Sequence, residues 1–158
     1  MMIFTTAADA SINHLVSFVL PTSILRDQLC GACLHIDEAF EDLPWDYEVV
    51  LVDDRQSQVA NAAFRQLNEA SHSRFRLEEF DRPLSRQQAL MAGVIAVKGK
   101  VIVLLDEVPH DFGQQLQWLL DSLDRAYETP ATSVAVASEH DSEYELAEMY
   151  RDHWSQVA

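Results

Sequence analysis

Two pairs of carboxylates stand directly after two aliphatic runs in this sequence. Asp53 and Asp54 follow residues 49–52, and Asp106 and Glu107 follow a second run of the same kind. Such runs, rich in β-branched residues, are typical of strands buried on both faces of a parallel sheet. In open α/β sheets, ligands bind at the carboxyl ends of the strands, so we expect Asp53 and Asp106 to face a ligand. The alternative for both residues is a local role as a helix cap or turn residue.

The elements that position these acids follow from hydrophobic periodicity. Aliphatic or alternating runs predict five strands, at residues 15–20, 47–54, 75–80, 101–105 and 133–137. Between and after the strands, apolar residues recur at helical spacing, which predicts helices at residues 23–41, 57–70, 87–97, 112–123 and 144–154. Strands alternating with helices indicate a doubly wound, Rossmann-like α/β fold with a mainly parallel sheet of about five strands.

Local signals add detail to this pattern. Ser85 with Gln88 three residues later predicts a capping box at the start of one helix, and Gly99 is placed to end that helix. Residues 1–14 show no strong period and are expected to form a loose arm. The remainder, residues 15–158, has no repeat or linker, so we expect a single domain.

The composition limits the class of protein. Of the 158 residues, 48% are hydrophobic, which excludes a disordered chain. The 26 acidic and 11 basic residues give a net charge of −15, which disfavours binding to nucleic acid or anionic membranes. A solvated acidic surface accounts for this charge, and a cationic partner or a divalent metal is compatible with it. Without an apolar run of roughly 20 residues or a secretory signal pattern, we expect a cytoplasmic protein with no membrane span.

The two cysteines, Cys30 and Cys33, form a C-x-x-C pair. Such a pair next to a strand is found in thioredoxin-like redox sites. Here both residues fall inside a predicted helix, with apolar neighbours at helical spacing, and no second pair exists for a four-thiolate zinc site. We therefore expect them to pack a helix, with a redox role as the alternative.

Four segments resemble those of a known family. They follow one another in an order and at spacings similar to those of the family-2 glycosyltransferases, which have the GT-A fold and use nucleotide-diphospho-sugars. The segments are residues 16–22, 47–54, 89–94 and 98–106. The resemblance implies that the chain transfers a sugar from a nucleotide-diphospho-sugar to a hydroxyl acceptor.

The resemblance also implies which residues bind the donor. By position, the nucleotide is bound by Pro21, Thr22, Asp53 and Asp54, with Asp53 on the base. The family holds Mn²⁺ or Mg²⁺ with a D-x-D motif, which falls at Asp106 and Glu107 here, and the metal neutralises the diphosphate of the donor.

The sequence departs from the family pattern at two functional points. The D-x-D position reads Asp106-Glu107-Val108, so its last carboxylate is missing. No residue is assigned as the catalytic base, because the family's acceptor-binding half comes after the point where this sequence ends. The alternative is therefore a non-catalytic binding or assembly module, in which Tyr144, Tyr150 and Trp154 serve a protein partner or a homo-oligomer.

A receiver domain is a weaker alternative for the same acids, and a few further residues are weaker candidates for a site. A receiver domain of two-component signalling also carries acids after its strands, here Asp53, Asp54 and Asp106, but no lysine follows Lys100 to bind a phosphoryl group. His110 is a further candidate for a metal site. Three arginines are placed to approach a diphosphate, although solvated surface positions are commoner for this residue type: Arg55, Arg82 and Arg86.

Overall fold

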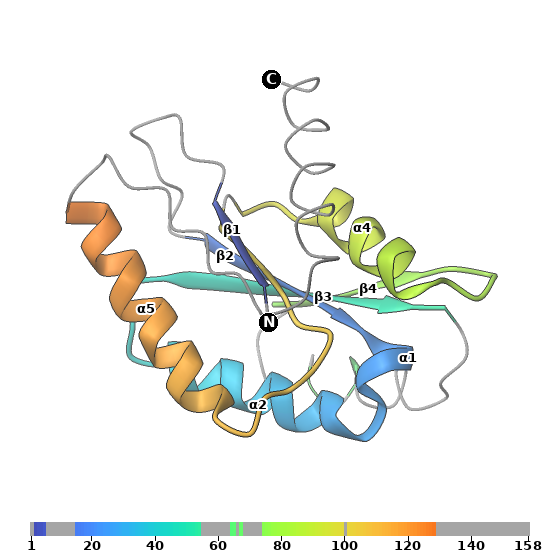
Figure 1. The fold of residues 1–158 in the computed structure, drawn as a ribbon, viewed down its shortest axis with the longest axis horizontal. Helices are drawn as coiled ribbons and strands as arrows, with labels where there is room; N and C mark the ends of the chain where they lie inside the picture. Colours follow the sequence, from blue (N-terminus) through green and yellow to red (C-terminus); the bar gives the residue numbers. More distant parts are fainter. Residues whose placement is uncertain are drawn as a thin grey trace.

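The computed structural model describes residues 2–5, 15–54, 64–65, 67, 74–99 and 101–128 (Figure 1). Its core is a five-stranded sheet of order β1-β5-β2-β3-β4. The strands are β1 (Met2–Thr5), β2 (Leu15–Pro21), β3 (Asp46–Asp53), β4 (Phe75–Glu79) and β5 (Val101–Leu104). Strands β5, β2, β3 and β4 run parallel to one another, as expected for a doubly wound fold. The fold class predicted from the sequence is confirmed.

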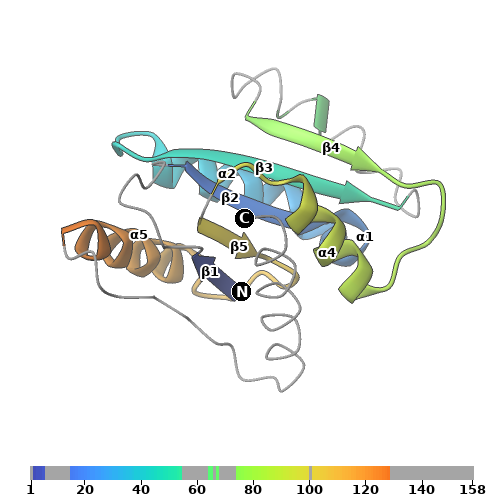
Figure 2. The same cartoon turned by 90° about the horizontal axis from the view of Figure 1, so that it is seen from above.

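Strand β1 corrects the expectation of a loose arm before residue 15. It pairs antiparallel with β5, from Met2 opposite Leu104 to Thr5 opposite Val101, and closes one edge of the sheet. Figure 2 shows β1 and β4 at opposite edges. Four residues are too few for a periodic signal in sequence, and the strand exists because β5 offers it backbone partners. The predicted strand at 133–137 and the helix at 144–154 lie outside the described residues.

Helices cover both faces of the sheet (Figure 1). On one face lie α1 (Thr22–Leu25), α2 (Leu29–Phe40) and α5 (Phe112–Glu128), and on the other lies α4 (Arg86–Ala96). The face under α2 holds a chain of aromatic contacts, in which Phe40 lies 5.8 Å from Phe18 and 5.0 Å from Tyr47 between ring centroids. Tyr47 in turn lies 6.5 Å from Phe75, so the rings join α2 to three strands.

The predicted helix at 23–41 is interrupted. After α1, the chain makes a short 3₁₀ turn, Arg26–Gln28, before α2 begins. Arg26 has a φ of 45°, a backbone conformation that α-helices cannot contain, and its Nε donates to the Ser23 carbonyl at 3.0 Å. Apolar periodicity runs through the break because both pieces pack on the same face of the sheet.

Helix α4 begins as predicted and ends differently. Ser85 Oγ accepts from the Gln88 N–H at 3.2 Å, and the Gln88 side chain accepts from the Ser85 N–H at 3.1 Å, which confirms the capping box. The helix ends at Ala96 with Val97 extended, and no glycine in the described residues has a positive φ. Gly99 therefore does not end the helix. A Cβ there would lie 2.5 Å from the Leu15 carbonyl oxygen, so the residue is glycine because two backbones pass closely.

Two further points complete the described elements. In the predicted helix at 57–70, the described residues 64, 65 and 67 are helical. Within the described part of the chain, no helix has the length and apolar character needed to cross a bilayer.

Candidate functional site

The predicted donor-binding residues lie at the carboxyl ends of three adjacent strands. Strand β2 lies between β5 and β3, and its end, Pro21, pairs with Val52 of β3. Asp53 is the last residue of β3, while Asp106 follows the end of β5. In doubly wound folds this edge is where ligands bind. The topology therefore brings both pairs of acids to the expected end of the sheet.

Asp53 and Thr22 form the best-defined part of this edge. Thr22 Oγ1 donates to Asp53 Oδ1 at 3.0 Å, and both residues are 1% exposed. Pro21 ends β2 in an extended conformation, which places Thr22 at the start of α1. Phe80 N–H also donates to the Asp53 backbone carbonyl at 2.8 Å, which ties the end of β4 to the same place. Three of the four residues predicted for the nucleotide, Pro21, Thr22 and Asp53, thus lie together.

Asp54 contacts a different part of the molecule. Its Oδ2 accepts from the Leu84 N–H at 3.1 Å, in the loop that leads into α4, and the residue is buried. Asp53 contacts α1 on one side of the sheet, whereas Asp54 holds the entrance to α4 on the other. This contact is the local structural role that acids at strand ends often have.

Asp106 forms an ion pair with a guanidinium. Arg86, the first residue of α4, approaches Asp106 Oδ2 through both Nε and Nη2. The Asp106 side chain is 9% exposed and the Arg86 side chain 49% exposed. Of the three arginines that the sequence offered near a diphosphate, Arg86 lies at the predicted metal position, and Arg55 lies outside the described residues.

The described residues do not fit a divalent metal at this position. Glu107 and His110 are exposed, and the described residues contain no group of three or more His, Cys, Asp or Glu side chains suited to hold a metal. Asp106, the central predicted ligand, already has a permanent cation as its partner. The described residues therefore favour a guanidinium over a metal ion beside Asp106.

The cysteine pair does not resemble a redox site. Cys33 is fully buried in the core against the sheet, Cys30 is half-buried, and both thiols are free. Burial, with smaller contributions from Cys30 and Asp37, raises the pKa of Cys33 from 9.0 to about 12. Reactive cysteines need the thiolate form near neutral pH, which this environment opposes. The helix-packing role predicted from spacing is the one the structure supports.

The strand order disfavours the receiver alternative. In a receiver domain, the first and third strands lie side by side in the sheet. If β3 were the first strand of a receiver, β5 would be the third and would have to lie beside β3. In this sheet β2 separates β3 from β5. Asp53 and Asp106 therefore do not follow adjacent strands, as the acids of a receiver do.

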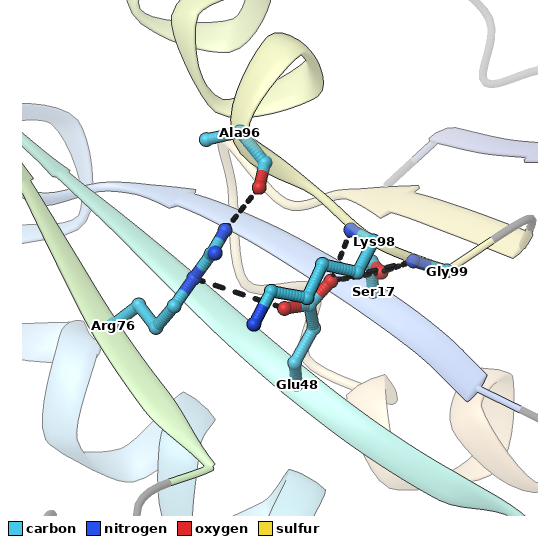
Figure 3. A network of polar contacts seen from close by, with 6 residues as sticks. All are labelled: Ser17, Glu48, Arg76, Ala96, Lys98 and Gly99. Atoms are coloured by element: carbon cyan, nitrogen blue, oxygen red, sulfur yellow. Dashed lines mark hydrogen bonds and ion pairs between the residues drawn. The ribbon is translucent and has the colours of Figure 1, made fainter.

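A buried polar network at the opposite end of the sheet was not anticipated from the sequence (Figure 3). Glu48 Oε1 accepts from Ser17 Oγ at 2.7 Å and from the Lys98 N–H, and its Oε2 lies 3.8 Å from Arg76 Nε. Arg76 also donates to the Ala96 carbonyl at the end of α4. The network lies near the amino ends of β2 and β3, away from the candidate site, and is structural. Its signal in the sequence is a single carboxylate inside an otherwise apolar strand.

Comparison with known proteins places the chain near one group of enzymes. No protein-family model matches it. Its relatives include undecaprenyl-phosphate 4-deoxy-4-formamido-L-arabinose transferases from Edwardsiella ictaluri (26% identity over 79% of this chain), Pseudomonas fluorescens (26% over 75%) and an Enterobacter species (29% over 75%). The chain covers only 38%, 35% and 36% of those proteins, respectively.

These relatives are family-2 glycosyltransferases. The sheet order, the acids at the strand ends and the similarity in sequence agree with one another. The chain is a distant homologue of the family-2 glycosyltransferases.

Proposed function

We propose that this chain binds the donor substrate of a glycosyltransferase reaction, in which a sugar passes from a nucleotide-diphospho-sugar to a hydroxyl acceptor. Support comes from the homology to transferases and from the parallel sheet with acids at its carboxyl edge. The observation that carries the proposal is the Thr22–Asp53 hydrogen bond at the ends of β2 and β3. It fixes a buried carboxylate where a doubly wound fold receives its ligand.

In this proposal, Pro21, Thr22 and Asp53 contact the nucleoside. A carboxylate with one oxygen held by a hydroxyl has further acceptor capacity for N–H or O–H groups of a base or ribose. Asp54 shapes the same edge by holding the loop before α4. Asp106 and Glu107 lie near the diphosphate of the bound donor in this proposal. No residue is assigned as the catalytic base.

The names of the relatives combine a modified arabinose with undecaprenyl phosphate. We propose undecaprenyl phosphate as the first acceptor to test with this chain. A cytoplasmic location is part of the same proposal.

A non-catalytic binding or assembly module is the second candidate. It is favoured by the ion pair between Arg86 and Asp106, which occupies the predicted metal ligand. In that case the same domain serves a protein partner or a second copy. The aromatic residues proposed for such a contact, Tyr144, Tyr150 and Trp154, lie outside the described residues.

Titration with UDP and GDP, with and without Mn²⁺, tests donor binding through the shift in melting temperature and by calorimetry. A nucleotide at 100 times its Kd stabilises the native state by about 2.7 kcal/mol, which raises Tm by several degrees. Asp53→Asn keeps an acceptor oxygen for Thr22 but loses the charge, and we expect it to weaken nucleotide binding by about tenfold, one hydrogen bond to a charged group.

The matched control is Asp121→Asn, which removes one negative charge from an exposed position on α5. It should bind nucleotide like the parent chain. If neither nucleotide shifts Tm at millimolar concentration under either condition, donor binding is refuted and the assembly module becomes the better description.

A further inference from the structure

The residue beside Asp106 is fixed in place by its helix. Arg86 is the first residue of α4, and the capping box formed by Ser85 and Gln88 determines where that helix begins. The guanidinium contacts Asp106 Oδ2 through Nε and Nη2, across 20 residues of sequence. An Arg side chain held at its base by a capped helix and at its tip by a carboxylate has little rotamer freedom left to lose on binding an anion.

The ion pair opposes a metal ion at the same carboxylate. A guanidinium stays protonated at any pH the protein tolerates, so it does not vacate the carboxylate by losing its proton. A divalent cation coordinated by Asp106 would lie within a few ångströms of that fixed positive charge, and like charges at that separation repel each other strongly in a partly buried site. Metal binding therefore requires Arg86 to move away.

The same arrangement suits a phosphate. Contact with Asp106 uses Nε and Nη2, and Nη1 carries further N–H donors. The Arg86 side chain is 49% exposed, so an anion can reach it from solvent. Guanidinium groups bind phosphate oxygens with charge-assisted, geometrically matched hydrogen bonds. The described residues at this edge include four carboxylates, which repel a diphosphate: Asp53, Asp54, Asp106 and Glu107. A diphosphate therefore needs a positive group in order to bind here.

We propose that Arg86 supplies the positive charge at this site, so that the chain binds the diphosphate of a sugar nucleotide without a divalent metal. This inference rests on the proposed function and adds to it the chemistry of diphosphate binding. Asp106 then acts as a positioning residue, because it orients the guanidinium and does not coordinate a cation. Binding that depends on a half-exposed arginine is sensitive to ionic strength.

The test measures the Kd of UDP by calorimetry with the full chain, in EDTA and in millimolar Mn²⁺. We expect the two values to agree within about twofold, and the affinity in EDTA to fall as salt is raised. Arg86→Gln should weaken UDP binding in EDTA by tenfold or more, and Arg86→Lys should give an intermediate loss, because Lys keeps the charge without the planar fork. Tm of each variant without ligand shows whether it is folded.

The matched control is Arg74→Gln, which removes the same charge and another carboxylate contact, to Asp46 near the amino ends of the strands. It should leave the Kd of UDP unchanged. Binding of UDP that requires Mn²⁺, or that survives Arg86→Gln in EDTA, overturns the inference while donor binding stands. Absence of UDP and GDP binding under both conditions refutes donor binding and the inference with it.

Discussion

At the scale of single residues, the carboxylates at the strand ends have separate partners. Asp53 is bound by the Thr22 hydroxyl, Asp54 by the Leu84 N–H and Asp106 by Arg86. Among the described residues, each of these side chains contacts a different segment. The arrangement favours recognition of an uncharged polar group near Asp53 and of an anion near Arg86.

Cys33 provides a test at the same scale. Because burial raises its pKa to about 12, we expect a thiol reagent at pH 8 to leave Cys33 unmodified in the native protein and to modify it after unfolding. The half-buried Cys30 is the internal comparison, since it lies one helical turn earlier on the same helix. Rapid labelling of both cysteines in the native state would restore the redox alternative.

The pH dependence of stability follows from the same shift. The native state holds the Cys33 proton more tightly than the unfolded chain does, whose thiol has a pKa near 9.0. This contribution to the free energy of unfolding is therefore complete below pH 9 and is lost as the pH rises towards 12. Burial and a hydrogen bond to Asp37 also raise the pKa of Tyr47, which acts in the same direction.

At the scale of elements, the packing of α4 on the sheet determines where Arg86 lies. Gly93 faces β2 and β3, and a Cβ there would lie 2.1 Å from Val19 Cγ1 and 3.1 Å from Val52 Cγ2. Both valines are buried and β-branched, so they have little freedom to move aside. Close packing at this point brings the helix, and with it Arg86, to the carboxyl edge.

Gly93→Ala should therefore destabilise the protein. Replacing glycine by alanine inside a helix stabilises the helix by about 1 kcal/mol. Overpacking a buried site costs about 1–3 kcal/mol, and we expect a cost of about 2–3 kcal/mol here because the new Cβ would lie so close to Val19. We expect a net loss of about 1–2 kcal/mol in the free energy of unfolding, measured by urea denaturation.

Gly31→Ala is the matched control. Gly31 lies in α2, is exposed, and would place no Cβ within 4 Å of another group, so we expect a gain of about 0.5–1 kcal/mol. If both substitutions stabilise the protein, α4 does not pack on the sheet as closely as the structure indicates.

At the scale of the whole molecule, the network around Glu48 joins parts of the chain far apart in sequence (Figure 3). Ser17 on β2, Arg76 on β4 and the turn between α4 and β5 all meet this one carboxylate. Gly99 N–H adds a donor to Ser17 Oγ at 2.9 Å. The network gives hydrogen-bond partners to the Ser17 hydroxyl, the Lys98 N–H and the Ala96 carbonyl at the end of α4.

Glu48→Gln tests the contribution of this network to stability. The substitution keeps an acceptor for Ser17 and Lys98 but places an amide where Arg76 meets a carboxylate oxygen. Arg76 is partly exposed, so we expect a loss of about 1–3 kcal/mol, below that of a fully buried broken pair. Glu79→Gln at the exposed end of β4 is the control and should change stability by less than 0.5 kcal/mol. Equal effects of the two substitutions would show that the network does not stabilise the fold.

The sequence by itself determined the elements that depend on local pattern. The four parallel strands follow from aliphatic or alternating runs, and the start of α4 follows from the spacing of Ser85 and Gln88. The resemblance to family-2 glycosyltransferases was also readable from motif order, and homology confirms it. These features are encoded within short windows, where side-chain type sets the period and the cap.

Only the tertiary structure decided which residues meet. Strand β1 exists through pairing with β5, α1 and α2 are separated by the backbone at Arg26, and Gly99 is set by a close approach to Leu15. The contacts of Thr22 with Asp53, of Arg86 with Asp106 and of Lys98 with Glu48 span 31, 20 and 50 residues. No local period carries such information, because these contacts form only when the packing of helices on the sheet brings distant segments together.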